Sequence, residues 1–288
     1  MKHELDIWLI GGDRRQQRLA GLLAEDGHSV HTLGLGPAKG SVREERELAG
    51  AALADCVVLP LPVAAPGGRL NAPLAEEPLP MEAVFAALRP GQIICGGRVD
   101  DATQAMARDR GLVLHDYFAR EELAVANAVP TAEGAIQIAL EEMPVTLHGS
   151  RVLVIGYGRL GRALAPRLAG LGAKVSVAAR KYADLAWAEG FGFGTEHTGE
   201  LKGWLCGYDL VVNTAPALVL GKEELEELKP ECVVIDLASL PGGVDFAAAQ
   251  ALGVKAVQAL SLPGKVAPAT AAAYLRSTIC HILHELGV

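Results

Sequence analysis

Short runs of apolar and β-branched residues alternate with longer amphipathic stretches along the whole chain. Ten of these runs have the length and composition of strands, namely residues 5–10, 29–33, 56–59, 92–95, 112–115, 151–155, 174–178, 209–213, 232–237 and 254–257. Most are continuously apolar and are separated by helical patterns, which is typical of parallel sheets covered by helices on both faces. Because the rhythm occurs twice in succession, it predicts an α/β fold with two doubly wound, Rossmann-like domains.

Two helical stretches organise these predicted domains. The segment PTAEGAIQIALEEMP, residues 130–144, places apolar residues at helical spacing between two prolines, and we expect a helix that bridges the domains. The final segment, residues 268–288, has apolar side chains on one helical face and is expected to pack back on the first domain. We therefore assign residues 1–130, completed by 268–288, to one domain, and residues 131–267 to the bridging helix and the second domain.

The stretch from residue 60 to residue 80, PLPVAAPGGRLNAPLAEEPLP, interrupts the alternation with a long segment rich in proline and glycine. Long ordered loops at strand ends are commonly functional or mobile, but a disordered insertion has the same composition. The sequence leaves both interpretations open.

Composition and charge then restrict the classes of function. With 288 residues, half of them apolar, the chain can bury two cores of ordinary size. It has 26 basic and 34 acidic residues and no basic stripe, which argues against a nucleic acid partner. The start, MKHELDIWLIGGD, is typical of a first strand and not of a secretory signal, and no apolar stretch approaches the ~20 residues of a membrane span, so we expect a cytoplasmic protein. The five cysteines form no C-x-x-C pair, so neither a disulfide framework nor a metal site is expected.

The second series of strands opens with a glycine motif that is typical of dinucleotide binding. RVLVIGYGRLG, residues 151–161, is a buried strand followed by three glycines at the spacing G-x-G-x-x-G and then a helical pattern. The first glycine permits the tight turn, the second lets the backbone approach a pyrophosphate, and the third lets helix and strand pack closely. We expect the cofactor to contact Gly156, Tyr157, Gly158, Arg159, Leu160 and Gly161.

The next strand ends in VSVAARK, where an acidic residue would normally bind the 2′-hydroxyl of NAD. Ala179, Arg180 and Lys181 offer no carboxylate there. A guanidinium fork beside an ammonium group suits a 2′-phosphate, so the sequence predicts NADP as the cofactor. A solvated basic loop is the alternative interpretation of the same residues.

Polar and glycine-rich loops follow the later strands. Because ligands of open parallel sheets gather at the carboxyl ends of strands, we expect the loops at 213–216, 236–243 and 262–268 to share one crevice. The loop that follows the predicted strand 209–213 adds four candidate cofactor contacts, Asn213, Thr214, Ala215 and Pro216.

The first series of strands carries cations at its predicted strand ends. The first strand ends in GGDRRQ, which lacks the third glycine of a dinucleotide site, so no second cofactor is expected there. Cations are disfavoured at a helix start, yet this one carries several beside a single aspartate. We therefore predict an anionic substrate whose carboxylates are held by Arg15, Arg98 and Lys265.

Taken in order, seven motifs span nearly the whole chain: GGDRRQ, NAVPTAEGAI, GYGRLG, VAAR, NTAP, DLASLPGG and LPGKVAPATA. Single motifs among them are shared with many dehydrogenases, but the ordered set resembles the A-subunit family of dipicolinate synthase. On that resemblance Arg15 and Gln16 match the first motif, the three glycines and Arg180 match the cofactor site, and Ser239 with residues 241–243 matches DLASLPGG. The chain departs from the family pattern at Leu240, where an arginine is usual, and at Ser261 or its neighbour, where a glycine is usual.

The resemblance implies an NADP-dependent oxidoreductase of the mother-cell cytoplasm in a sporulating bacterium. It implies formation of dipicolinate, pyridine-2,6-dicarboxylate, from a dihydrodipicolinate-type precursor, and its partner would be the flavoprotein-like B-subunit of the synthase. A homo-oligomer is also expected. Arg15, Arg98 and Lys265 would hold the two carboxylates, while Asn213 and Ser239 would orient the ring and the nicotinamide. The sequence identifies no general base, and aromatisation of the ring makes positioning sufficient.

Three other functions compete with this one. A 2-hydroxy-acid dehydrogenase needs a histidine near PGKVAP, where this chain has Lys265. A shikimate-type dehydrogenase needs an N-terminal lysine motif that the sequence does not contain. A non-catalytic NADP-binding module is the alternative from a different class of protein.

Overall fold

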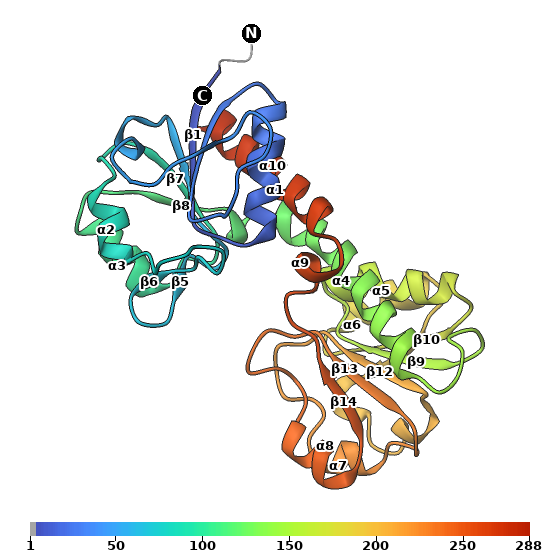
Figure 1. Ribbon diagram of the computed structural model, residues 1–288. Coiled ribbons are helices and arrows are strands. Elements are labelled where there is room, and N and C mark those ends of the chain that lie inside the picture. The colour runs from blue at the N-terminus through green and yellow to red at the C-terminus, as the bar shows by residue number, and fades with distance from the viewer. Residues whose placement is uncertain (1–3) are drawn as a thin grey trace. The chain divides into compact units, whose positions relative to one another are not determined.

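The computed structural model describes residues 4–288, which divide into two compact units. One unit runs to Ala126 and is completed by Ala267–Val288, and the other is Asn127–Val266. The boundary between them falls inside the long helix α4, Glu121–Glu142. Figure 1 shows both units, with labels on most of their elements.

The first unit is built on a six-stranded sheet in the order β3-β2-β1-β4-β7-β8. The strands of this sheet are β1 (Asp6–Ile10), β2 (Ser29–Leu33), β3 (Arg43–Glu44), β4 (Cys56–Val58), β7 (Ile93–Gly96) and β8 (Leu114–Asp116). Its helices are α1 (Arg14–Glu25), α2 (Met81–Ala86), α3 (Asp101–Arg108) and α10 (Pro268–Glu285), with short 3-10 turns at Ala51–Leu53 and Tyr117–Ala119. All neighbouring strands of this sheet are parallel.

The second unit repeats the arrangement, with the order β11-β10-β9-β12-β13-β14. The strands are β9 (Arg151–Ile155), β10 (Lys174–Ala179), β11 (Gly194–His197), β12 (Leu210–Asn213), β13 (Val233–Asp236) and β14 (Lys255–Gln258). The helices are α5 (Arg159–Gly170), α6 (Tyr182–Gly190), α7 (Lys222–Glu226), α8 (Phe246–Leu252) and α9 (Leu262–Val266), with 3-10 turns at Thr198–Glu200 and Leu205–Gly207. These strands are also parallel, so both sheets are doubly wound and the predicted fold class is confirmed.

Strand order reverses between β1 and β4 in the first unit, and between β9 and β12 in the second. At such a switch point the connections leave toward opposite faces of the sheet, which opens a crevice at the carboxyl ends of the strands. The loops that the sequence singled out, after β1, β7, β9, β10, β12, β13 and β14, all lie at those ends.

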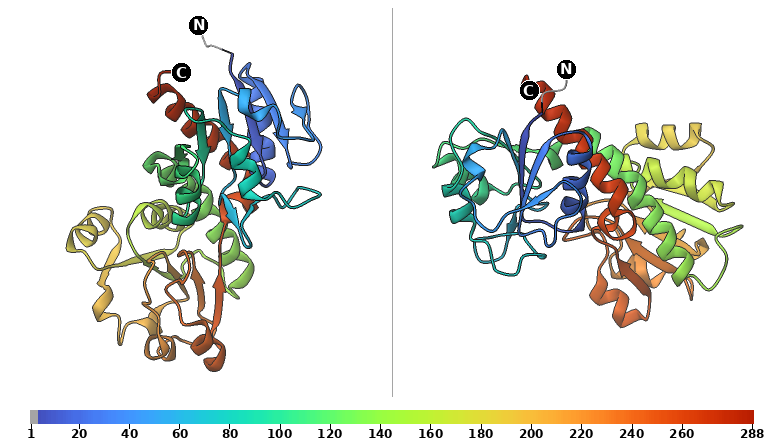
Figure 2. Two further views of the ribbon diagram at one scale, coloured as in Figure 1. Left: turned by 90° about the vertical axis from the view of Figure 1, so that its left-hand side faces the viewer. Right: turned by 45° about the horizontal axis from the view of Figure 1, so that its top comes forward.

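The C-terminal helix completes the core of the first unit. Leu275 and Ile279 of α10 are buried in the same cluster as Leu19 and Leu23 of α1. Figure 2 shows the two helices side by side, red and dark blue, and their contact confirms the expected return of the C-terminal helix. Four buried leucine and isoleucine side chains of this size stabilise the pairing by roughly 1.5–3 kcal/mol each.

The bridging helix differs from the expectation. It begins at Glu121 and not in the first turn at Pro130, which lies inside α4. The residues before Pro130 are good helix formers, and the Thr131 hydroxyl donates to the carbonyl of Asn127, 2.6 Å away, one turn earlier. By length and composition α4 could cross a membrane. However, it supplies Leu123 to one core and Ala132, Ala135 and Ala139 to another, as a core helix does.

The edge strands and the proline-rich segment show features that the sequence patterns did not predict. The ten predicted strands all occur, with ends shifted by at most two residues, but the edge strands β3 and β11 were not predicted. The proline-rich segment is folded: it contains the two-stranded hairpin of β5 (Ala64–Ala65) and β6 (Arg69–Leu70), and it buries Val63 and Leu70. Ser261 has a φ of 60°, a conformation that favours glycine, and the resemblance implies a glycine at this residue or its neighbour.

Candidate functional site

The three glycines of the dinucleotide motif lie between the end of β9 and the first turn of α5, and each has different surroundings. Gly156 has a φ of 95°. A Cβ atom at Gly161 would lie 2.1 Å from the Gly156 carbonyl oxygen, so only glycine lets the helix approach the strand. A Cβ atom at Gly158 would meet no heavy atom of residues 4–288 within 4 Å. Gly158 therefore faces open space at the position where the motif brings its backbone to a pyrophosphate.

The first turn of α5 has backbone donors that no side chain caps. Gly158 is the N-cap residue and supplies no side-chain acceptor, and the first turn contains no acidic residue. The N-terminus of a helix carries partial positive charge from its unsatisfied N–H groups. The open space, the uncapped donors and the absence of a competing carboxylate in this turn fit a dinucleotide pyrophosphate.

The end of β10 carries the predicted cofactor-selecting cations. Ala179 is buried, whereas Arg180 and Lys181 are exposed and form no ion pair with any described residue. His197 of β11 fixes this turn, because its Nε2 lies 3.1 Å from the Arg180 carbonyl oxygen while its Nδ1 accepts from Gly199 at 3.1 Å. The sequence motifs do not include His197, since its role depends on an edge strand that has no clear hydrophobic pattern.

An aromatic ring lies beside these cations. Tyr182, the first residue of α6, is 75% exposed and stacks on the His197 ring with centroids 5.4 Å apart. An exposed ring held flat next to two cations is suited to contact a purine base. Sequence patterns miss it, because an exposed tyrosine at a helix start has no distinguishing spacing.

The other residues between Gly156 and Gly161 differ in their surroundings. Tyr157 is buried, its carbonyl accepts from Arg162 Nε at 3.1 Å, and the Arg162 guanidinium lies over its ring. Burial raises the pKa of Tyr157, with Arg162 opposing the rise. Leu160 packs against the core, and Arg159 is exposed at the start of α5.

The loops after β12 and β13 are tied together by a buried carboxylate. Asp236 accepts from Asn213 Nδ2 at 2.8 Å and from the backbone N–H groups of Ala238 at 3.0 Å and Gly243 at 2.8 Å. Neither Asp236 nor Asn213 is exposed to solvent. The other hydrogen of the Asn213 amide goes to the Ala215 carbonyl, so this side chain shapes the loop. Asp236 organises both loops, a role that its place in the DLASLPGG motif does not indicate.

The same loops explain further residues of the motifs. Thr214 donates through Oγ1 to the carbonyl of Ile155 at 2.9 Å and closes the loop onto β9. A Cβ atom at Gly243 would lie 2.2 Å from Asn213 Nδ2, which requires glycine there. Pro216, Ser239 and Lys265 are exposed, and Lys265 forms no ion pair within residues 4–288.

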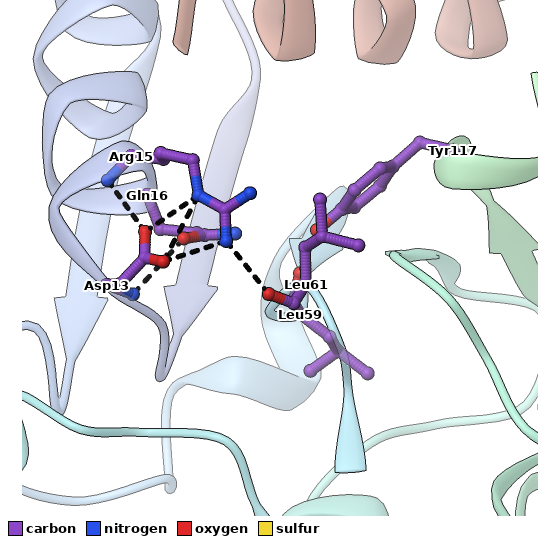
Figure 3. A network of polar contacts seen from close by, with 6 residues as sticks. All are labelled: Asp13, Arg15, Gln16, Leu59, Leu61 and Tyr117. Atoms are coloured by element: carbon purple, nitrogen blue, oxygen red, sulfur yellow. Dashed lines mark hydrogen bonds and ion pairs between the residues drawn. The ribbon is translucent and has the colours of Figure 1, made fainter. Parts of the chain in front are cut away.

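The equivalent turn of the first unit, between β1 and α1, is filled by its own side chains (Figure 3). Asp13 occupies the N-cap of α1, where its carboxylate accepts from the backbone N–H of Arg15 at 2.8 Å. Gln16 Oε1 accepts in turn from the Asp13 backbone N–H at 3.2 Å, which completes a capping box. The helix start that would attract an external anion is thus already satisfied by a carboxylate of the chain.

Arg15 is held in a fixed orientation. Its guanidinium forms a forked pair with Asp13, with Nη2 to Oδ2 at 2.8 Å, and Nη2 also donates to the Leu61 carbonyl at 3.1 Å. The Arg15 side chain is only 14% exposed. In Figure 3 its other terminal nitrogen has no dashed contact, and no described residue accepts from it. Arg15 therefore presents one free edge of its guanidinium, already oriented.

Tyr117 supports this network. The ring is fully buried and its hydroxyl donates to the Leu59 carbonyl at 2.9 Å. Burial raises the pKa of Tyr117, although the neighbouring Gln16 amide and Arg15 oppose the rise. The Gln16 nitrogen is buried and forms no hydrogen bond of normal geometry with described residues. A Cβ atom at Gly97 would lie 2.4 Å from the Tyr117 ring, which explains the glycine directly after β7.

Arg98 follows directly and is held by a carboxylate at the end of β8. Asp116 accepts from the backbone N–H groups of Arg98 and Val99, each at 3.0 Å. Arg98 has a φ of 52°, a strained conformation for a residue with a side chain, and its side chain is exposed without an ion pair among the described residues. Arg15 and Arg98 thus belong to the first unit, at the ends of β1 and β7, whereas Ser239 and Lys265 belong to the second.

Two models of known protein families match this chain, and each match covers the sheet of one unit. Residues 6–118 match the model of the N-terminal domain of the dipicolinate synthase A-subunit. Residues 122–257 match the NAD-binding domain of the D-isomer specific 2-hydroxyacid dehydrogenases. The second match covers the glycine turn, the cations after β10 and the Asp236 loops.

Full-length relatives are also found. A protein described as the A-subunit of dipicolinate synthase from Bacillus subtilis (strain 168) is 32% identical over 287 residues, 98% of this chain and 97% of that protein. A crystal structure described as the A chain of dipicolinate synthase from Bacillus subtilis matches with a TM-score of 0.90. It is 31% identical, and the match covers 100% of this chain and 98% of that one. The crystal structure of the A-subunit of dipicolinate synthase from Bacillus halodurans matches with a TM-score of 0.89 and 30% sequence identity, and the match covers 97% of each chain.

Proposed function

Because the chain belongs to the A-subunit family of dipicolinate synthase and carries a dehydrogenase-type NAD(P)-binding domain, we propose that it is the NADP-dependent oxidoreductase that forms dipicolinate. The observation that carries the proposal is the full-length identity of 32% with the Bacillus subtilis protein. We infer that it acts in the cytoplasm of a sporulating cell, as a homo-oligomer and together with the flavoprotein-like B-subunit. The open glycine turn after β9 supports the cofactor part of the proposal.

NADP is proposed over NAD because two unpaired cations end β10 where NAD enzymes have a carboxylate. Replacing Arg180 with aspartate should lower the affinity for NADP relative to NAD by about ten- to a hundredfold, the equivalent of one charge-assisted hydrogen bond to a phosphate. Lys174→Asp is a matched control, because Lys174 is exposed at the opposite end of the same strand. The proposal fails if Arg180→Asp and Lys174→Asp give the same ratio of affinities.

The reaction that we propose removes two electrons from the ring of the substrate. A ring C–H bond of a dihydropyridine dicarboxylate breaks, and hydrogen leaves with both electrons as hydride while a second ring hydrogen leaves as a proton to water. NADP⁺, held by the turn between Gly156 and Gly161 and by Arg180, would supply the hydride acceptor. The products are then the aromatic dicarboxylate, NADPH and one proton, and the gain of aromaticity removes the need for a strong base.

The chain's own residues would position the substrate. The free edge of the Arg15 guanidinium is oriented by Asp13 and Leu61, and it suits a planar carboxylate. Arg98 and Lys265 are the other proposed carboxylate partners, and Ser239 the proposed contact to the ring. Arg15→Ala should raise KM at least about tenfold, since a buried charge-assisted pair contributes more than about 1.4 kcal/mol.

The control for the Arg15 variant is exposed Arg108, at the far end of α3. Arg108→Ala removes the same charge from the same unit without touching the turn between β1 and α1. Steady-state kinetics of both variants measure KM. Equal KM values for Arg15→Ala and Arg108→Ala would contradict the proposed role of Arg15.

The central experiment mixes the purified chain with NADP⁺ and freshly generated dihydrodipicolinate, and follows NADPH and the pyridine product by absorbance. Equal amounts of both establish the dehydrogenase and show that no partner is needed. If tight NADP binding occurs without turnover, addition of the B-subunit separates a shared catalytic site from a non-catalytic binding module. Turnover of a 2-hydroxy acid in place of the pyridine precursor would favour the family of the second domain match instead.

A further inference from the structure

The first unit contains a cavity that the proposed reaction does not use. It has a volume of about 240 Å³ and lies between α1, the loop after β2 and the start of α10. The side chains that line its polar part are Arg14, Gln17, Arg18 and Lys39, and its apolar part includes Leu35 and Pro37. We refer to this cavity as the basic crevice.

The walls of the basic crevice are fixed by hydrogen bonds and buried side chains. The Gln17 amide of α1 donates to the Leu35 carbonyl at 3.1 Å and to the Pro37 carbonyl at 3.4 Å, which ties the loop to the helix. Leu35 is 2% exposed and Thr32, at the end of β2, is 3% exposed. The crevice is therefore part of the folded unit and does not depend on a loop moving onto it.

The charges of the crevice are not compensated within the described chain. Arg14, Arg18 and Lys39 are all exposed and form no ion pair with residues 4–288. The first turn of α1 contains no acidic residue, and the Asp13 carboxylate is taken by Arg15. On the loop itself, the Glu44 carboxylate accepts from the Ala38 backbone N–H at 3.4 Å. In a protein with a net charge of −8, three unpaired cations around one cavity favour an anionic ligand.

The topology indicates what kind of anion fits. Gly11 donates to the Leu33 carbonyl at 2.8 Å, as Gly156 of the second unit donates to the Ala178 carbonyl at 2.7 Å. By this equivalence the loop after β2 corresponds to the loop after β10, on the adenosine side of a nucleotide site. The pyrophosphate position is filled by Asp13 in the first unit, so a dinucleotide is excluded. The crevice beside it has room for one phosphate and an apolar or planar body.

We propose that the basic crevice binds a small phosphate monoester with a planar or apolar body, of the class of a nucleoside monophosphate. Arg14, Arg18 and Lys39 bind the phosphate, and Leu35, Pro37 and Pro268 contact the body of the ligand. The site is separate from the glycine turn after β9, and all of its residues belong to the first unit. None of the residues proposed to hold the dipicolinate precursor lines the crevice, so binding there is expected to be independent of the dipicolinate reaction.

The test is a calorimetric titration of the full chain with adenosine monophosphate, in low salt and in the presence of saturating NADP to occupy the second unit. We expect one binding event per chain, weakened at least about tenfold in the double variant Arg18→Glu/Lys39→Glu, as two phosphate contacts are lost. Arg46→Glu/Arg108→Glu makes the same change of net charge at exposed positions of the same unit and should leave the affinity unchanged.

Three results would overturn the proposal. They are an absence of binding once NADP is saturating, an equal loss of affinity in both double variants, and tighter binding of pyridine-2,6-dicarboxylate than of the monophosphate at this crevice. Inorganic phosphate is titrated in parallel and is expected to bind more weakly, since it lacks the body that contacts Leu35 and Pro37. Turnover in Arg18→Glu/Lys39→Glu should remain normal, which separates failure of this site from failure of the proposed reaction.

Discussion

In one unit the chain leaves β9 through Gly156 and enters α5 at a glycine cap; in the other it leaves β1 through Gly11 and enters α1 at Asp13. Both Gly156 and Gly11 have positive φ, and both donate to the end of the neighbouring strand. Yet the turn at Asp13 contains its own anion, neutralised by Arg15, whereas the glycine turn keeps open space and uncapped N–H donors. Strand order thus fixes where a helix start lies, and the cap residue determines whether its N–H donors are already satisfied by the chain.

The largest effect is expected from the glycines that distinguish the two turns. Gly158→Ala and Gly161→Ala should each lower NADP affinity by about a hundredfold, equal to two lost charge-assisted hydrogen bonds. Only Gly161→Ala should also destabilise the fold, by roughly 1–3 kcal/mol, because its Cβ would lie 2.1 Å from the Gly156 carbonyl oxygen. Cofactor fluorescence titration and urea unfolding measure the two quantities. Equal destabilisation by both variants would show that Gly158 does not face open space.

The next prediction compares how NADP changes the rate of thiol labelling of buried cysteines in the two units. At a concentration of about one hundred times its Kd, NADP should stabilise the second unit by about 2.7 kcal/mol and slow thiol labelling of Cys232 by about a hundredfold. Burial raises the pKa of Cys232 to about 12, partly opposed by Lys229, so labelling requires opening of the unit.

Cys56 and Cys95 of the first unit provide the internal control for that experiment. Both are fully buried, and the pKa of Cys56 is raised by its hydrogen bond with Cys95 and by burial. Their labelling, followed by mass spectrometry of peptides, should not respond to NADP. If all three thiols are protected to the same degree, the two units unfold together as one cooperative structure.

A third prediction concerns the turn between β1 and α1, where Asp13 is the N-cap residue. Asp13→Ala removes the N-cap acceptor of α1 and leaves the Arg15 guanidinium without its carboxylate. We therefore expect a loss of about 2 kcal/mol in the free energy of unfolding. Asp13→Asn keeps an acceptor for the N–H of Arg15 and should be destabilised less. Thermal and urea unfolding measure both variants, and equal destabilisation would mean that the charge of Asp13 alone holds the turn.

The smallest effect concerns a pair of carboxylates at equivalent places in the two sheets. Asp209 accepts from the N–H of Arg151 at 2.7 Å and pairs with Lys229; Asp55 accepts from Asp6 at 2.8 Å without a lysine partner among the described residues. Burial would raise the pKa of Asp209, but the hydrogen bonds from Lys229 and Arg151 outweigh it and lower the pKa below its usual range.

Because the folded pKa of Asp209 is depressed, its contribution to stability is present above about pH 4 and is lost as the pH falls further. Asp209→Asn should therefore cost under about 1 kcal/mol at about pH 7, with the difference from the unsubstituted protein shrinking toward about pH 3. Asp55→Asn is the matched variant and should cost less at neutral pH, since no ion pair with a lysine is lost. Urea unfolding at several pH values decides the point; a difference for Asp209→Asn that grows in acid would contradict a depressed pKa.

Most of the fold could be predicted because its determinants are local. Continuous apolar strands such as 151–155 and 209–213 give both strand positions and the parallel sheet, and the three-glycine spacing locates the helix start that follows. The true start of α4 was missed because Pro130 resembles a first-turn residue, while its helix is extended by residues 121–129. The edge strands β3 and β11 are short and polar, and periodicity does not detect such segments.

The candidate site was less predictable, because its polar contacts join residues far apart in the chain. Arg15 was chosen for its charge, but its orientation comes from Leu61, 46 residues later. Asn213 is predicted to contact the ligand, and the sequence does not show that its amide also donates to Asp236 and Ala215. The roles of His197 and Tyr117 follow only from neighbours brought by other strands. The individual site residues stay predictions until the variants above are measured.

The return of α10 to α1 has a consequence for biosynthesis. The first unit needs residues from both ends of the chain, while the second is a single continuous segment. On the ribosome, the apolar face of α1 that bears Leu19 and Leu23 is therefore synthesised long before the leucine and isoleucine side chains of α10 that cover it. The inserted unit can therefore complete its folding before the first unit, whose apolar α1 face stays uncovered until α10 has been synthesised.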